Sequence, residues 1–370
     1  MKPFALVNLS KEHWNNPRRA RKQLLYSALL KNPEVERMLY VDPHRKPWQS
    51  PVDASSSSPD IKIWQGTLIF PGERIPLIRS INRRLLSKSL VKRMKASSHW
   101  HIFFYHPWDV PLVTCLSTRG EIFFDWTEDW AVYHDIAAMK HAQRHAVKLA
   151  SGVITVSEKL YKRAVNIRGA DKHVLFLPNA SAWQHAGGNL KIEKISSIPK
   201  PRVGYVGHVG GWLDLDLVTK LAKLRPNWHW IMVGHVSETA RERLLGYSNI
   251  HLLGQVPYSN LPGYMARCQV LAALYQENFD GDATKLYDYL TIGSPIVSTD
   301  VETARRLIPH VRIANGVQSW IDLLEAALKE NDLKLKRARQ EESLNHTWDH
   351  RASVLLGWIK GFQKSRGVTD

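Results

Sequence analysis

Cysteine is scarce in this chain, and its two copies lie far apart. Cys115 and Cys268 are the only cysteines in 370 residues, and neither stands in a spacing typical of metal ligands. The sequence therefore excludes a disulfide framework and favours a reducing compartment. We interpret both thiols as small buried apolar side chains rather than nucleophiles.

Long apolar runs are missing as well. No window approaches the roughly 18 consecutive apolar residues of a membrane-spanning helix. The first ten residues hold too short an apolar stretch for a signal peptide and instead predict a first strand. We expect a cytoplasmic protein, with peripheral attachment to the cytoplasmic face of a membrane as a further option.

Negative charge is in short supply. There are 51 Lys and Arg against 34 Asp and Glu, which gives a net charge of +17. Such an excess of positive charge predicts an anionic partner. Nucleic acid, an anionic lipid surface and a phosphate-bearing substrate all fit this prediction. The length suffices for two ordinary domains, and a hydrophobic content of 44% is that of a globular protein.

What is present is an alternation of short apolar runs and helical patterns, which predicts α/β layers with parallel sheets. A polar stretch from about 183 to 200 resembles a linker between two such halves, and most of the last fifty residues read as helical. Expected strands lie at 4–8, 38–41, 61–64, 101–105, 121–124, 152–156 and 174–177, then at 202–206, 228–233, 250–252, 270–273 and 295–297.

Residues 278–299 are the most informative stretch. A polar loop runs into a short helix with Lys285 in its first turn and Asp288 three residues on, before Gly293 and Pro295 end the helix and a strand follows. A helix N-terminus with a lysine is suited to bind phosphate. Asp288, on the same face, can accept hydrogen bonds from sugar hydroxyls.

This stretch resembles the nucleotide-sugar site of GT-B glycosyltransferases, K-L-Y-E-Y-L-A-x-G-x-P-V-V, with Asp288 for Glu. Other segments resemble the same family in its order: 175–180 (P-N-G, with Ala180 for Gly), 204–217 (G-Y-x-G and D-x-x-L), and 253–262 (L-G-x-x-P-Y-x-x-L-P). Residues 123–130 resemble the Y-D-x-x-D-D-W segment of polysaccharide and teichuronic-acid-type transferases. The likeness is to the family-4, or group 1, type.

The resemblance implies a GT-B fold, with two Rossmann-like domains facing a central cleft. The expected N-terminal acceptor-side domain covers 1–185 and the nucleotide-sugar-binding domain 200–340. A helix within 341–370 is expected to return to the first domain.

The resemblance also implies a donor site in the second domain. The diphosphate is expected at Lys285, Gly207 and Thr284, where Gly207 lets the backbone approach phosphate without a Cβ clash. Ribose and base are expected at Asp288, Gln255 and Val256. The donor sugar is assigned to Asp280 and Asp282, although the family has glutamates at the matching spacing and Asp280 is shorter.

On the acceptor side, Asp125 or Asp129 follows a first-domain strand and is a candidate base, with helix capping as the other interpretation of Asp129. His106 joins them as a catalytic candidate, or is structural. Arg18, Arg19 and Trp14 are assigned to the acceptor side. A phosphate-bearing acceptor would explain the basic tract 18–22, which is otherwise a solvated face. The glycine pair that the family has after the first strand is missing.

A second basic tract, 74–95, has apolar residues at helical spacing and fits either an interface helix on anionic lipid or a helix packed on the core. We expect a metal-independent glycosyltransferase that moves a sugar from a nucleoside diphosphate sugar, by preference a UDP-sugar, to a glycan or lipid-linked acceptor in polysaccharide biosynthesis. No cofactor, metal or nucleic acid is expected. The alternatives are a sugar-nucleotide-modifying enzyme such as a 2-epimerase, and a non-catalytic basic protein that binds nucleic acid or membrane.

Overall fold

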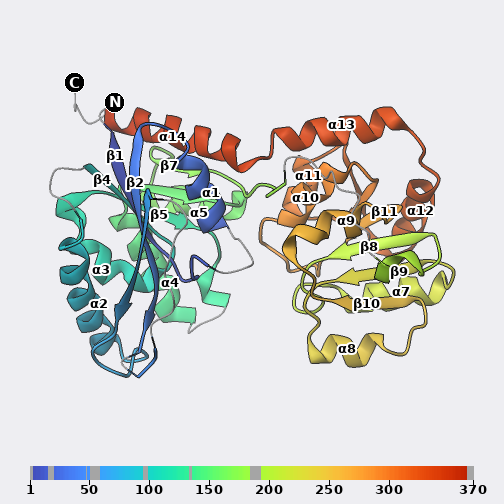
Figure 1. Ribbon diagram of the computed structural model, residues 1–370, viewed down its shortest axis with the longest axis horizontal. Helices are drawn as coiled ribbons and strands as arrows, with labels where there is room; N and C mark the ends of the chain where they lie inside the picture. Colours follow the sequence, from blue (N-terminus) through green and yellow to red (C-terminus); the bar gives the residue numbers. More distant parts are fainter. Residues whose placement is uncertain are drawn as a thin grey trace. The chain divides into compact units, whose positions relative to one another are not determined.

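The computed structural model describes residues 3–15, 21–46, 48–50, 59–94, 99–132, 136–183 and 193–364. The chain divides into two compact units, each with its own sheet (Figure 1). The first unit consists of residues 1–178 together with 351–370, and the second of residues 179–350.

The first unit contains a seven-stranded sheet in the order β3-β2-β1-β4-β5-β6-β7, and its strands pair in parallel. The order reverses between β1 and β4, as in a doubly wound α/β fold. The strands are β1 Phe4–Leu9, β2 Val35–Arg45, β3 Ile61–Thr67, β4 His99–Phe104, β5 Gly120–Trp126, β6 Gly152–Thr155 and β7 Val174–Phe176.

Helices cover both faces of this sheet, so its central strands are almost wholly apolar. One face carries α1 and α14, where Tyr26 packs on Phe103 and Trp358 on Phe123. The other face packs against α2 to α5. The helices are α1 Arg21–Leu29, α2 Pro76–Val91, α3 Val110–Thr114, α4 Ile136–Leu149, α5 Glu158–Arg168 and α14 Trp348–Lys364, with 3₁₀ turns η1 Pro107–Asp109, η2 Ser117–Arg119 and η3 Trp130–Val132.

The second unit repeats this plan with six parallel strands in the order β10-β9-β8-β11-β12-β13. Here the order reverses between β8 and β11. The strands are β8 Arg202–Val206, β9 His229–Val233, β10 Ile250–Gly254, β11 Val270–Ala273, β12 Ile296–Thr299 and β13 Val311–Ala314.

Two apolar clusters, one on each face, form the core of the second unit. Helix α10 ends where the sequence predicts, because Gly293 adopts a left-handed φ of +78°. The helices are α6 Glu193–Ser196, α7 Leu215–Leu224, α8 Glu238–Leu244, α9 Leu261–Met265, α10 Thr284–Ile292, α11 Glu302–Arg306, α12 Gly316–Leu328 and α13 Leu333–Leu344, with the 3₁₀ turn η4 Tyr258–Asn260.

All twelve strands expected from the sequence are confirmed within a few residues at their ends, and β13 is an additional strand. The expectation for the thiols is confirmed for Cys268, which is buried, but is wrong for Cys115, which is exposed. Within the described residues, no helix is long and apolar enough to cross a membrane.

Candidate functional site

The candidate donor site lies in the second unit, where the strand order reverses. Open α/β sheets bind their ligands at the carboxyl ends of the strands that flank such a reversal. Here the loop after β8 begins at Gly207, and Tyr275 follows shortly after β11. Helix α10, which carries Lys285, starts at the end of the loop that contains Tyr275.

Lys285 lies between two aromatic rings. Its ammonium is 3.7 Å from the ring centroid of Tyr205 and 4.9 Å from that of Tyr275. Burial lowers the pKa of Lys285 to about 7. No described carboxylate forms an ion pair with it, so its charge is held by π faces and remains available to an anion.

Gly207 sits directly against this lysine. A Cβ at Gly207 would lie 3.1 Å from Lys285 Nζ, and the residue adopts a φ of +144° that disfavours any side chain. The neighbouring Gly234 is needed for a different reason, since its Cβ would lie 1.9 Å from the Gly207 carbonyl oxygen. The loop therefore leaves bare backbone beside a free ammonium, as a diphosphate requires.

Asp288, one turn along α10, is held by the segment that opens the second unit. Ser181 Oγ donates a hydrogen bond to its carboxylate at 2.8 Å. Burial raises the pKa of Asp288 to about 7, against the opposing effect of hydrogen bonds from Ser181 and the Ala182 backbone. A carboxylate in this position can accept a further hydrogen bond from a ribose hydroxyl.

The two aspartates assigned to the donor sugar differ in the structure. Asp282 has a fully buried side chain that pairs with Arg306 at 2.9 Å. It also accepts hydrogen bonds from Thr303 Oγ1, Tyr287 Oη and the Asn179 amide. These bonds occupy its oxygens and fix the loop before α10. Asp280 is half-buried in the same loop, and its assignment to the sugar stays a prediction.

The remaining donor-side residues lie in the loops of the second unit. Thr284 is exposed as the first residue of α10. Gln255 is exposed just after β10, and Val256 packs partly against the core. Next to them, Trp183 stacks on Tyr258 with ring centroids 4.6 Å apart. The contacts of Gln255 and Val256 with a base stay predictions.

In the first unit, Asp125 is fully buried and forms an ion pair. Its carboxylate accepts a hydrogen bond from Arg21 Nε at 2.9 Å, and both side chains are shielded from solvent. Lys22, the next residue of α1, lies 3.4 Å from Glu12 and is also buried. For Arg21 and Lys22 the interpretation of the tract as a solvated face is wrong, because both meet carboxylates inside the unit.

Asp129 caps the short turn η3. It accepts a hydrogen bond from the Ala131 amide at 3.3 Å, which agrees with the capping interpretation. It also pairs with Arg163 at 2.6 Å and accepts a bond from Gln143. These partners hold the pKa of Asp129 below its usual value against the effect of burial. Its role as a base stays a prediction.

The other acceptor-side candidates follow β1 and β4. His106 is nearly buried, with its ring 4.6 Å from Trp130 and its Nδ1 accepting from the Trp108 amide. Trp14 packs edge-on against Tyr40, and its amide donates to Asp42. Arg18 and Arg19 lie outside the described residues.

The structure adds residues that the sequence patterns did not single out. Tyr205 and Tyr275 flank Lys285, and Ser181 bonds Asp288. In the first unit, Glu128 stands between Asp125 and Asp129 in sequence, but it is exposed. Partial desolvation raises its pKa above the ordinary value of a glutamate. The only sequence signal for Glu128 is its place in the T-E-D-W stretch.

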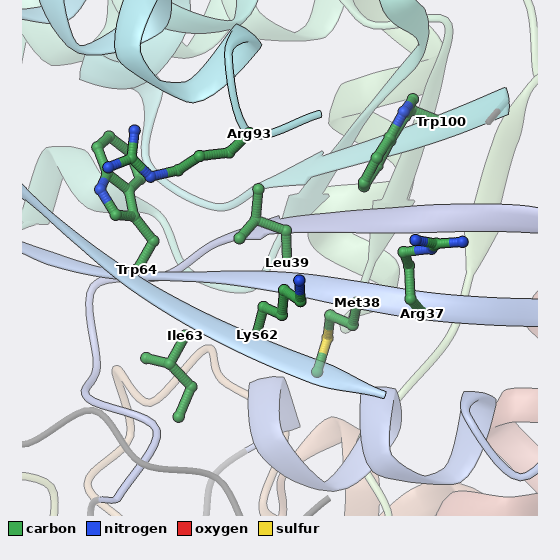
Figure 2. Close-up of a pocket in the computed structure, with 8 residues that line it drawn as sticks. All are labelled: Arg37, Met38, Leu39, Lys62, Ile63, Trp64, Arg93 and Trp100. Carbon is green, nitrogen blue, oxygen red and sulfur yellow. The ribbon is translucent and has the colours of Figure 1, made fainter. Parts of the chain in front are cut away.

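A separate cavity of about 300 Å³ lies at the amino-terminal part of the first sheet, away from the carboxyl ends (Figure 2). Arg93 lies over the Trp64 ring, 4.8 Å from its centroid, and Trp100 forms part of the wall. Arg37 and Lys62 complete a basic rim. This cavity contains none of the predicted site residues.

Comparison with known proteins agrees with this geometry. The family model of glycosyl transferases group 1 matches residues 200–329, the part that holds the Lys285 site. TuaH of Bacillus subtilis (strain 168), a protein assigned to teichuronic acid biosynthesis as a glycosyltransferase, is 22% identical over 265 residues. Over residues 200–329 the chain is similar to the group 1 glycosyltransferases. The match covers 65% of this chain and 66% of the relative, about two thirds of each.

Solved structures show that the chain has the GT-B fold. Sucrose-phosphate synthase from Thermosynechococcus elongatus is similar with a TM-score of 0.74 at 14% identity, covering 98% of this chain and 100% of that one. Anabaena HepE, solved in complex with UDP and glucose, is similar with a TM-score of 0.69 at 12% identity, covering 97% and 100%.

Proposed function

We propose that this chain transfers a sugar from a nucleoside diphosphate sugar to a glycan or lipid-linked acceptor in cell-surface polysaccharide biosynthesis. The observation that carries the proposal is Lys285, a desolvated lysine without an ion pair among the described residues. It stands at the strand reversal beside the bare backbone of Gly207. A diphosphate would supply the negative charge that this ammonium lacks.

The donor site supports the chemistry of a diphosphate leaving group. Negative charge develops on the departing diphosphate in the transition state, where Lys285 and the N-terminus of α10 would stabilise it. Asp288 would bind the ribose and fix the nucleoside. This arrangement supplies the positive charge that a metal would otherwise provide, and we propose no cofactor or metal for the transfer step.

UDP is our preferred nucleotide. HepE, which shares the fold, was solved with UDP and glucose, and a further structure of the same fold is a UDP-forming trehalose-phosphate synthase. The likeness to a teichuronic acid biosynthesis protein supports a polysaccharide acceptor. A 2-epimerase acting on the sugar nucleotide is the alternative, and incubation of UDP-sugars without acceptor would reveal it by an isomerised donor.

Calorimetric titration with UDP, GDP and dTDP tests the donor assignment. We expect micromolar binding of UDP, weakened about 10–100-fold in Lys285→Ala, since a hydrogen bond to a charged group contributes about 1.5–3 kcal/mol. Lys220→Ala is the matched control, because Lys220 is an exposed lysine of the same unit. Unchanged UDP affinity in Lys285→Ala would refute the phosphate assignment.

A peripheral membrane contact is proposed at the start of α2. Leu86 and Leu90 of this helix are buried in the core, which agrees with a packed helix for that part of the tract. Ahead of them, Ile69, Ile75 and Leu77 are each more than half exposed. Exposed cations lie on the same segment, namely Arg74, Arg84 and Lys88. Apolar tips beside cations suit an anionic lipid surface.

Sedimentation with vesicles tests this contact. We expect binding to vesicles that contain phosphatidylglycerol and none to pure phosphatidylcholine. The Ile75→Ser/Leu77→Ser variant should lose this binding while its UDP affinity is unchanged. Leu245→Ser is the control, since Leu245 is an equally exposed leucine elsewhere, at 67% against 69% for Leu77. Equal binding of all three proteins would contradict the assignment.

A further inference from the structure

Two histidines and a glutamate meet at the amino-terminal edge of the first sheet, at the opposite end of its strands from the predicted acceptor residues. His99 is the first residue of β4, and His101 follows two positions later. Alternate residues of a strand share a face, so both imidazoles project to the same side. Glu121 of β5 is the register partner of His101 and adds its carboxylate to that side.

The three side chains already converge on one point. Glu121 Oε2 lies 2.7 Å from His99 Nε2 and 3.2 Å from His101 Nδ1. One donor atom from each residue lies within 4.8 Å of the other two. With this spacing, a single metal ion could displace the protons that now link Glu121 to the two histidines. Small side-chain movements would then give three metal–ligand bonds.

The surrounding core holds this arrangement in place. The His101 ring is fully buried and packs edge-on against Phe4 and Phe123, with centroids 4.5 and 5.5 Å away. Trp100, between the two histidines, faces the other side of the sheet and lines the cavity in Figure 2. A rotation of the strand that would separate the histidines is therefore opposed by packing on both faces.

We propose that His99, His101 and Glu121 form a binding site for a divalent transition metal, with Zn²⁺ as the preferred ion. Two imidazoles and one carboxylate are typical zinc ligands, whereas Mg²⁺ and Ca²⁺ prefer sites made of oxygen. The fourth position is open to water, because the side chain of His99 is 45% exposed. The ion joins the first residues of strands β4 and β5 and takes no part in sugar transfer.

Equilibrium dialysis of the chelator-treated full chain against ZnCl₂, followed by elemental analysis, tests the site. We expect one equivalent of zinc per chain, and visible absorption typical of tetrahedral Co²⁺ when cobalt replaces it. His99→Ala removes an exposed ligand and should weaken zinc binding by more than about 100-fold, beyond the loss typical of outer-shell mutations. Glu121→Gln should also weaken it, and MgCl₂ should not compete.

The matched control is the His141→Ala/His145→Ala variant. These exposed histidines lie four residues apart on α4 and are a competing pair for an adventitious ion. Zinc binding that persists in this variant and is lost in His99→Ala supports the proposal. Absence of zinc from the native chain, or loss of zinc only in the α4 variant, overturns it. Circular dichroism melting confirms that each variant is folded.

Discussion

The ammonium of Lys285 lies 3.7 Å from the centre of the Tyr205 ring. A π face attracts a cation without neutralising it, so the lysine stays desolvated and in place while its charge remains unpaired by any described carboxylate. A buried ammonium without a counter-ion is costly, and the fold tolerates it here at the point where strand order reverses. Binding of an anion offsets this desolvation cost.

Donor binding should therefore weaken at alkaline pH. Burial lowers the pKa of Lys285 to about 7, so in the free protein the binding-competent cation is progressively lost as pH rises above this value. Between pH 7 and the higher pKa of the liganded lysine, UDP affinity should fall by up to about tenfold per pH unit. Calorimetry at several pH values measures this slope, and proton uptake appears as heat that depends on the buffer. Lys285→Arg should abolish the slope, whereas a flat profile in the native chain would contradict it.

Acid pH should weaken binding through a different residue. Burial raises the pKa of Asp288 to about 7, so the carboxylate that would accept a ribose hydrogen bond is neutralised as pH falls below this value. UDP affinity should drop more steeply than pyrophosphate affinity, because pyrophosphate has no ribose and loses only the contribution of its own phosphate charge. Asp288→Asn should lose this acid limb and bind UDP less tightly at pH 8. An equal acid limb for UDP and pyrophosphate would remove Asp288 from the ribose site.

The Gly207→Ala variant, compared with a second glycine variant, distinguishes the effect of lost space beside Lys285 from the effect of backbone strain. The added Cβ would lie 3.1 Å from Lys285 Nζ at a φ of +144°, so both the strained backbone and the displaced lysine should weaken UDP binding at least tenfold. Gly169→Ala is the control, because Gly169 has a φ of +75° and open space around its Cβ position. It should cost about 1–3 kcal/mol in unfolding free energy without changing UDP affinity. Equal UDP affinity in both variants would exclude close approach of phosphate to Gly207.

The donor helix could be predicted from sequence because its signals are local. Lys285, Asp288 and Gly293 lie within a few turns, and helical periodicity fixes which of them share a face. The flanking tyrosines lie in β8 and in the loop after β11, about 70 residues apart in the sequence, so no local pattern joins them. Asp282 illustrates the reverse case, since we assigned it to the donor sugar but Arg306, from the later helix α11, engages it.

Strand register could not be predicted from the sequence either. His99 and His101 show as an H-x-H pattern, but the position of Glu121 beside them depends on the pairing of β4 with β5. Strand β13, Val311–Ala314, was missed because its alternating run is short and includes Arg312, whose charge is paired with Glu330. Local periodicity therefore predicts elements, whereas contacts between distant strands and helices decide which polar residues are engaged.

The Arg21–Asp125 pair provides a test that separates structural support from catalysis. Asp125→Ala leaves a buried guanidinium without its carboxylate and should cost about 3–5 kcal/mol in unfolding free energy. Adding Arg21→Met should recover most of this loss, since the double variant buries no unpaired charge. Urea denaturation measures both, with Glu128→Gln as the control, because exposed Glu128 should change stability by less than about 0.5 kcal/mol. If Asp125→Ala is as stable as the native chain but no longer transfers sugar, Asp125 is the base and not a structural partner of Arg21.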